Sequence, residues 1–218
     1  MKKFFKNNGL SISFLLMFVF SLIGQAVTGM KEYNKELKEY HQPAVSFGDY
    51  LHSGHFVQAT FENWESEFLQ MALFVILTIF LFEKGSSESK KIDEENEVDR
   101  DPDPMKKDAP WPVRRGGWIL AVYKHSLSIA LLLLFFLSFA AHFEGSLRST
   151  NKEHTIKGEA LEKGIDYLAG SRFWFESFQN WQSEFLSVFA IVALSIYLRQ
   201  KGSPQSKPVD ASHAETGE

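Results

Sequence analysis

Residues 61–69 read Phe61-Glu62-Asn63-Trp64-Glu65-Ser66-Glu67-Phe68-Leu69, and residues 178–186 read Phe178-Gln179-Asn180-Trp181-Gln182-Ser183-Glu184-Phe185-Leu186. The two stretches lie 117 residues apart, since 181 − 64 = 117 for their tryptophans. At this offset residues 10–90 align with residues 127–207 without a gap, and 30 of the 81 positions are identical. Agreement over that length predicts that the chain is a tandem duplication.

Each copy of the stretch leads into an apolar run, and each copy also follows one. The four runs cover residues 10–23, 68–82, 127–143 and 185–198. With its flanks, each run reaches the roughly 20 residues that a helix needs to cross the hydrocarbon of a bilayer. The sequence therefore predicts an all-α, integral membrane four-helix bundle, built from two tandem two-helix repeats.

The predicted boundaries follow from these runs. The first repeat takes residues 1–90, with transmembrane helices at about 9–30 and 61–82, and the second takes residues 118–207, with helices at about 123–144 and 176–199. The first helix is expected to run on past the membrane, because Tyr33, Leu37 and Tyr40 share one of its faces. Residues 91–117 form a charged cytoplasmic linker that is too polar to bury a core, and residues 208–218 a loose tail.

Lys and Arg near the helix ends indicate the orientation. Twelve such residues lie on the side of the two termini and eight on the other, which favours cytoplasmic termini. The N-terminal run also has the form of a signal peptide, with Lys2, Lys3 and Lys6 before it and Gly24-Gln25-Ala26 at its end. Its counterpart in the second repeat lies in the middle of the chain, which argues for a retained helix instead.

Polar residues line one face of each helix that follows the repeated stretch. At 100° per residue, Asn63, Glu67, Gln70 and Thr78 lie within about 80° of one another. Their counterparts are Asn180, Glu184, Ser187 and Ser195. If the bundle closes around these faces, one polar intramembrane cluster would contain Gln25, Asn63, Glu67, His142, Asn180 and Glu184. The alternative is structural: Asn63 and Asn180 cap their helices, and the glutamates complement the helix dipole.

A metal site has weaker candidates outside the apolar runs. Asp49, His52 and His55 are spaced by three residues, which places them on one face if that segment is helical. The second repeat has Asp166, Ala169 and Arg172 at these positions, so the pattern is not repeated. Exposed histidines are usually solvated, and metal binding by these residues stays a minor hypothesis.

Several motifs together resemble a known family. They are the two Asn-Trp-x-Ser-Glu-Phe-Leu stretches, Gly24-Gln25 followed by Thr28-Gly29 and Tyr33-Asn34, and the ending Leu198-Arg199-Gln200-Lys201-Gly202-Ser203-Pro204. They resemble an uncharacterised bacterial family of small two-repeat integral membrane proteins, a domain of unknown function. The resemblance covers nearly the whole chain and implies a multi-pass protein of the bacterial cytoplasmic (inner) membrane. It implies no reaction, substrate or catalytic residue.

Composition excludes several functions. The chain has no cysteine, a net charge of −4 and scattered cations, so thiolate sites and nucleic-acid binding are not expected. No phosphate-binding loop or other cofactor motif is present, and an enzyme is not expected. The expected partners are the lipid bilayer, a second copy of the chain or another membrane protein. The leading interpretation is a non-enzymatic structural or interaction protein; the alternative is a small transporter, channel or proton-coupled protein that uses Glu67, Glu184 and His142.

Overall fold

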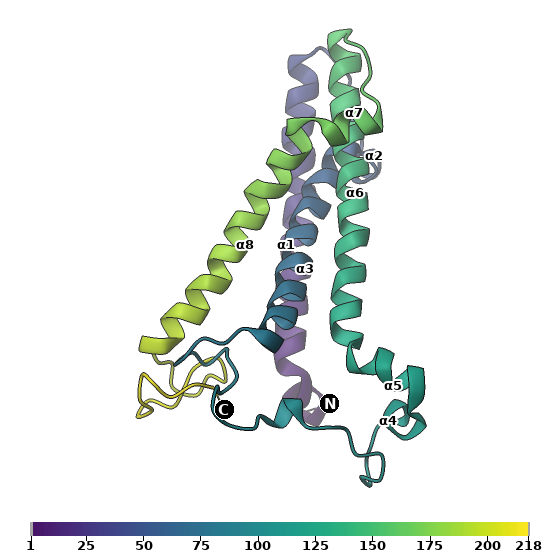
Figure 1. Ribbon diagram of the computed structural model, residues 1–218. Helices are drawn as coiled ribbons and strands as arrows, with labels where there is room; N and C mark the ends of the chain where they lie inside the picture. Colours follow the sequence, from purple (N-terminus) through teal and green to yellow (C-terminus); the bar gives the residue numbers. More distant parts are fainter. Residues whose placement is uncertain (1, 218) are drawn as a thin grey trace. The chain divides into compact units, whose positions relative to one another are not determined.

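The computed structural model describes residues 2–217, and this part of the chain is helical and contains no strand. Its four long helices are α1 (Lys2–Glu39), α3 (Gly54–Phe80), α6 (Ser126–Lys157) and α8 (Ser171–Tyr197) (Figure 1). The predicted all-α class is confirmed. Among residues 2–217, α1 and α6 are the two helices that are long and apolar enough to cross a membrane by length and composition.

Short helices connect the long ones. In order, they are α2 (Phe47–Leu51), the single 3-10 turn η1 (Glu97–Asp99), α4 (Trp111–Arg115), α5 (Gly117–Lys124) and α7 (Gly164–Ala169). Ser46 starts α2 as an N-cap, because its hydroxyl accepts a hydrogen bond from the backbone N–H of Asp49. The prediction that the first helix runs past the apolar region is confirmed, since α1 continues to Glu39 and Leu37 is buried.

The helices that carry the repeated stretch begin earlier than their apolar runs. Helix α3 begins at Gly54 and α8 at Ser171, so Asn63 and Asn180 lie well inside their helices. The interpretation of these asparagines as N-caps is therefore wrong. Hydropathy marks where a helix becomes apolar, whereas the helix itself begins where backbone hydrogen bonding begins, and the polar residues ahead of the apolar run are helical too.

The chain divides into two compact units. The first contains Met1–Phe61 and Ala140–Phe173, and the second contains Glu62–Phe139 and Trp174–Glu218. Each unit is described by itself below.

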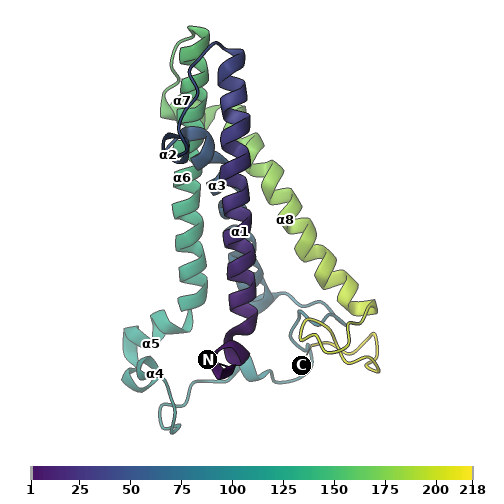
Figure 2. The same cartoon turned by 180° about the vertical axis from the view of Figure 1, so that it is seen from behind.

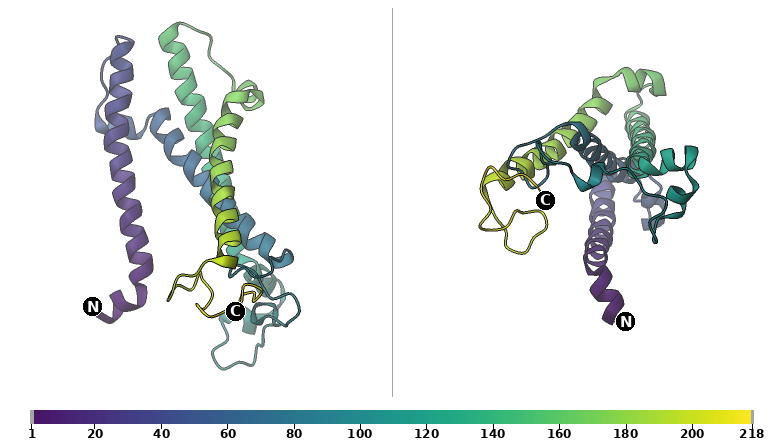
Figure 3. Two further views of the ribbon diagram at one scale, coloured as in Figure 1. Left: turned by 90° about the vertical axis from the view of Figure 1, so that its left-hand side faces the viewer. Right: turned by 60° about the horizontal axis from the view of Figure 1, so that its bottom comes forward.

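In the first unit, the chain folds back beside the end of each long helix that it leaves. After α1 it returns alongside that helix (Figure 2), and after α6 it does the same (Figure 3). An asparagine holds each return segment: the Asn34 side chain accepts from the Val45 N–H at 2.7 Å and donates to the Val45 carbonyl at 3.1 Å. Asn151 makes the same pair of bonds with Glu162, at 2.7 and 3.0 Å.

The core of the first unit is aromatic. Tyr50 of α2, Tyr167 of α7 and Phe173 at the start of α8 are each at most 2 % exposed. The Tyr50 hydroxyl lies against Gly29 of α1, where a Cβ atom would be too close, and the Tyr167 hydroxyl is hydrogen-bonded to Ser146 of α6. Helices α2 and α7 thus each insert a tyrosine beside the long helix that precedes them.

Two glycines let backbones approach closely in the first unit. A Cβ atom on Gly54 would lie 2.5 Å from the Ser149 nitrogen, and one on Gly145 would lie 2.5 Å from the Gln58 nitrogen. The start of α3 therefore crosses α6 at backbone contact, which is the close approach that small residues permit in helical membrane proteins.

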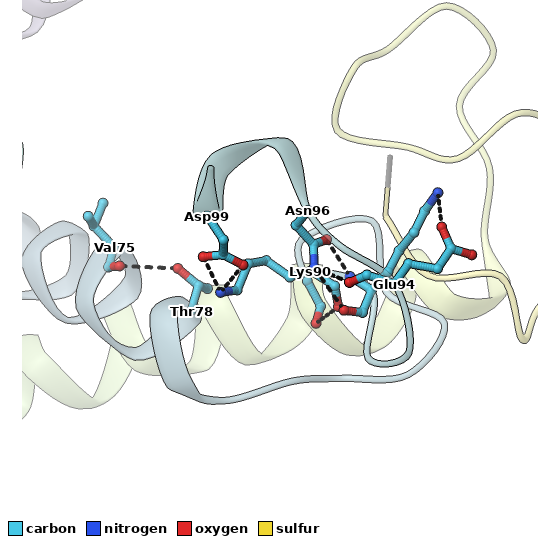
Figure 4. A network of polar contacts seen from close by, with 8 residues as sticks. Val75, Thr78, Lys90, Glu94, Asn96 and Asp99 are labelled. Carbon is cyan, nitrogen blue, oxygen red and sulfur yellow. Dashed lines mark hydrogen bonds and ion pairs between the residues drawn. The ribbon is translucent and has the colours of Figure 1, made fainter. Parts of the chain in front are cut away.

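In the second unit, the linker and the tail make extensive polar contacts. Lys90 donates to both carboxylate oxygens of Asp99 at 2.9 Å, and the Asn96 side chain holds the backbone of Lys91 (Figure 4). Near the end of α8, the Arg199 guanidinium donates to the carbonyls of Pro208 and Ala211. Residues beyond the two long helices of this unit are thus tied to their ends.

Candidate functional site

The strongest polar feature of the second unit is a seam between α3 and α8. The Gln70 side-chain amide donates to the Ser187 hydroxyl at 2.9 Å and to the Glu184 carbonyl at 3.2 Å. One turn earlier, Glu67 and Glu184 are close enough for the charge of one to act on the other. The sequence placed these residues on the polar faces of their helices. The structure joins Gln70 to Ser187 by a hydrogen bond and places Glu67 within electrostatic range of Glu184.

A buried carboxylate lies on the same seam. Glu65 is fully buried, and the indole N–H of Trp181 donates to its carboxylate at 2.9 Å. A further pair, Glu62 and Glu176, brings carboxylate oxygens from α3 and α8 within 4.8 Å of each other. The hydrogen bond from the Trp181 indole thus fixes the position of the Glu65 side chain between the two helices.

Sequence reasoning missed Glu65, Glu62 and Glu176. The polar-face analysis followed Asn63 and Glu67, both of which are exposed in the structure, whereas Glu65 lies about 200° around the helix from Glu67. The signal available in the sequence was Trp181, in the second copy of the stretch, because its indole N–H needs a hydrogen-bond acceptor when it is buried. Which carboxylate that donor reaches depends on packing that helical periodicity does not specify.

The remaining members of the predicted cluster belong to different surroundings. Gln25, in the first unit, donates its side-chain amide to the Thr60 hydroxyl at 3.2 Å. His142, also in the first unit, is fully buried, and its ring centre lies 4.9 Å from that of Phe173. In the second unit, the Asn180 amide donates to the Glu176 carbonyl of its own helix at 3.0 Å. The six-residue cluster stays a prediction.

The weak metal candidates each have a local contact. Asp49 accepts from the Ser46 hydroxyl at 2.6 Å, and the His52 ring nitrogen contacts the Gly48 carbonyl at 2.9 Å. The His55 ring lies 3.2 Å from the Tyr50 hydroxyl and packs beside Tyr33. Metal binding by these three residues stays untested.

Burial shifts the pKa values of His55 and Tyr50. Desolvation lowers the pKa of His55 below its ordinary value of 6.5, while the charge of Glu36 opposes that shift. Desolvation, followed by the charge of Glu36, raises the pKa of Tyr50. Burial therefore favours the neutral form of the His55 ring, which contacts the Tyr50 hydroxyl.

Several hollows occur beside the ends of α3 and α8 in the second unit, and two of them are large. One, of about 550 Å³, is lined by α3 and the linker, with Thr78, Glu88, Lys90 and Asp99 among its residues. The other, of about 820 Å³, is lined mainly by residues 200–210 of the tail. Both are open to the surface and mix charges of both signs, and neither singles out a ligand.

The described residues thus define an all-α protein that has two helices apolar enough for a membrane and a polar seam between two further helices. The chain belongs to the family described as Domain of unknown function (DUF6766), whose model matches residues 1–218. The expected membership in a domain family of unknown function is confirmed. Searches of the curated proteins and of the solved structures gave no match.

Proposed function

We propose that this chain is an integral membrane protein of the bacterial inner membrane, with a non-enzymatic structural or interaction role. The observation that carries the proposal is the surface of α1. Only 6 % of its most apolar stretch is buried, and large apolar side chains are exposed on every side of the helix, among them Phe14, Leu15, Leu16, Met17 and Phe20. Such a surface is stable in hydrocarbon and costly in water.

The proposed architecture is two tandem two-helix repeats that form a four-helix bundle, with the apolar parts of α3 and α8, within about residues 61–82 and 176–199, as the other two spans. Its support is the spacing of the elements. The bounds of α3 and α8 differ by 117 residues at both ends, since 171 − 54 and 197 − 80 both equal 117. The same offset separates Asn34 from Asn151, and it also separates their hydrogen-bond partners, Val45 and Glu162.

The N-terminal helix belongs to the mature protein in this proposal. Cleavage after Ala26 would divide α1 within a continuous helix. The part of α1 beyond that point is packed in the first unit, where Gly29 contacts Tyr50 and Asn34 holds Val45. Removing residues 1–26 would also remove Gln25, which donates to Thr60.

A sodium carbonate wash of bacterial membranes tests the membrane assignment. An integral protein stays in the pellet, whereas release of the full-length chain into the supernatant would overturn the proposal. Protease added to intact spheroplasts tests the orientation, in which both termini are cytoplasmic. A C-terminal tag should resist digestion until the membrane is broken, and loss of the tag from intact spheroplasts would reverse the topology.

The interaction role assigns partner binding to the cytoplasmic linker, residues 91–117. It supplies acidic residues such as Glu95, Asp101 and Asp103 to a partner. Cross-linking and pull-down with the full chain and with a variant lacking residues 91–105 tests this role. An unchanged set of partners, self-association included, would remove the linker from the proposal.

A second candidate function is a proton- or ion-coupled protein that uses Glu67, Glu184 and His142. The supporting observation is that Glu67 and Glu184 lie close enough for their charges to interact on the seam that also contains the buried Glu65. Carboxylates inside a membrane are expensive, and they commonly mark ion or proton pathways. Proton flux into proteoliposomes should fall in the Glu67→Gln/Glu184→Gln variant and persist in Glu162→Gln, an outer-segment control. Wild-type flux in the double variant would exclude this function.

A further inference from the structure

The segment ahead of α6 presents aromatic and cationic side chains together. Trp111 and Trp118 are 63 % and 77 % exposed, and Arg114, Arg115 and Lys124 are exposed as well. The opposite side of α4 is already used, since Val113 is buried. The tryptophans and the cations are therefore the outward-facing groups of α4 and α5.

The fold keeps this segment close to the end of α6. Only His125 separates α5 from α6, and the eight residues of α5 extend about 12 Å. On the other side of α5, the chain turns sharply between α4 and α5 at Gly116 and Gly117, whose φ angles of 69° and 59° lie in the left-handed region. Helix α4 packs against α5 as a result. If α6 crosses the membrane, this short connection keeps α4 and α5 near the headgroup layer, whose charge acts on cations over a Debye length of roughly 10 Å.

The cations of this segment form no ion pair with the described residues of the protein. Residues 109–126 contain no Asp or Glu, and none of the ion pairs found among residues 2–217 includes Arg114, Arg115 or Lys124. Three cations earlier in the chain differ in this respect. Lys90, Lys91 and Arg100 pair with Asp99, Glu94 and Glu97. These acidic residues are thus paired with cations of residues 90–100, and Arg114, Arg115 and Lys124 stay available to a ligand.

We infer that α4 and α5 form a binding surface for anionic lipid headgroups, with Arg114, Arg115 and Lys124 on the lipid phosphates and Trp111 and Trp118 at the boundary with the acyl chains. This inference rests on the proposed membrane location. Guanidinium groups bind phosphate through paired donors, and indole rings prefer the interfacial layer. Phosphatidylglycerol supplies the net negative charge that phosphatidylcholine lacks, so the surface should select the former.

The absence of cysteine makes a site-specific test direct. Val122, which is 50 % exposed on α5, is changed to cysteine and labelled with a fluorophore in the full chain. The protein is reconstituted in vesicles of phosphatidylcholine and phosphatidylglycerol, of which one or the other carries a nitroxide near the top of the acyl chain. We expect the phosphatidylglycerol analogue to quench the label severalfold more strongly. A label at Val98→Cys, 79 % exposed in the linker, should be quenched by neither.

Two charge variants give the decisive comparison. Arg114→Gln/Arg115→Gln/Lys124→Gln should reduce the preference for phosphatidylglycerol by about tenfold or more, because each cation near an anionic surface contributes substantially to binding. The control, Lys31→Gln/Lys35→Gln/Lys38→Gln, removes the same charge from the C-terminal end of α1, which the proposed topology places on the outer side of the membrane. It should leave the preference for phosphatidylglycerol unchanged.

Equal quenching by both lipids in the unmodified charge background would overturn the inference, and so would no quenching at residue 122. Either result is separate from the membrane assignment. Resistance to carbonate together with equal quenching keeps the integral location and removes the lipid-binding surface, whereas release by carbonate removes both.

Discussion

The Gln70 amide and the Ser187 hydroxyl, 117 residues apart in sequence, are joined by a 2.9 Å hydrogen bond between α3 and α8. The same offset relates the two copies of the stretch that begins at residue 61. Residues that meet their own counterparts lie on a two-fold axis, so this contact is what an axis between α3 and α8 would produce. Glu67 and Glu184, whose charges interact, are also separated by 117 residues.

The Gln70–Ser187 bond should be measurable as a coupling energy. A double-mutant cycle of Gln70→Leu and Ser187→Ala, read from unfolding in detergent, should give about 0.6–1.7 kcal/mol, the size found for interhelical hydrogen bonds in membranes. The control pairs Ser187→Ala with Thr78→Val, because the Thr78 hydroxyl donates only to carbonyls of its own helix. Additive effects of the first pair would show that the bond does not form.

The crossing of α3 and α6 should not tolerate a methyl group. Gly145→Ala is expected to destabilise the protein by about 1–3 kcal/mol, since the new Cβ would meet backbone that cannot rotate away. Gly24→Ala is the matched control, because nothing lies within 4 Å of its Cβ position. It should be neutral or stabilising by up to about 1 kcal/mol. Unfolding transitions of the two variants in the same detergent settle the comparison, and equal stability would contradict the backbone contact.

The two asparagines that hold the return segments should be equally important. Each makes two hydrogen bonds to backbone, so Asn34→Ala and Asn151→Ala should each lower the free energy of unfolding by about 1–3 kcal/mol. Asn8→Ala, whose amide reaches only the exposed Phe4 carbonyl, should change it by less than about 0.5 kcal/mol. A large difference between Asn34 and Asn151 would count against equivalent roles in the two halves.

Removing the indole donor from Glu65 should be costly. Trp181→Phe keeps most of the ring but deprives a fully buried carboxylate of one donor, and should cost about 1.5–3 kcal/mol. Trp118→Phe, at a highly exposed position, is the control and should leave thermal stability nearly unchanged. If both variants melt together with the wild type, the Trp181–Glu65 bond does not contribute.

Stability should fall in mild acid because of His55. Its pKa is lower in the folded state than in the unfolded state, so the unfolded chain binds more protons as the pH falls. His55 makes its full contribution to the free energy of unfolding well above pH 6.5. That contribution is lost as the pH falls from there through the lower folded-state pKa. The groups that face the ring are Tyr33 and Glu36 of α1 and Tyr50 of α2.

Thermal unfolding between about pH 7.5 and 5 tests the role of His55. His55→Phe should weaken the pH dependence, while His52→Gln, an exposed neighbour, should preserve it. An identical slope in wild type and His55→Phe would exclude His55 as its source.

Sequence patterns predicted the all-α fold and placed Glu67, Gln70 and Glu184 on the polar faces of their helices, but they did not predict the burial of Glu65. Helix periodicity reports which residues share a face, and it correctly grouped Glu67 with Gln70. It cannot report which face a neighbouring helix covers, because that depends on contacts such as Trp181 with Glu65 across 116 residues. The start of α3 shows the same limit. The sequence of residues 46–60 indicates a turn and a short helix that lead into the apolar helix, whereas the structure makes residues 54–60 continuous with α3, where Gly54 contacts the backbone of α6.

The glycine crossing also bears on how a duplicated chain can diverge. At the offset of 117, Gly54 corresponds to Ser171, and Gly145 corresponds to Thr28. A homodimer of the first half would have to oppose Gly54 with Thr28, and a homodimer of the second half would oppose Ser171 with Gly145. Only the fused chain can place glycine against glycine at one crossing and leave larger residues at the other. In the proposed tandem repeat, a single chain can therefore hold two interfaces with different residues, and neither half contains both sides of the closer one.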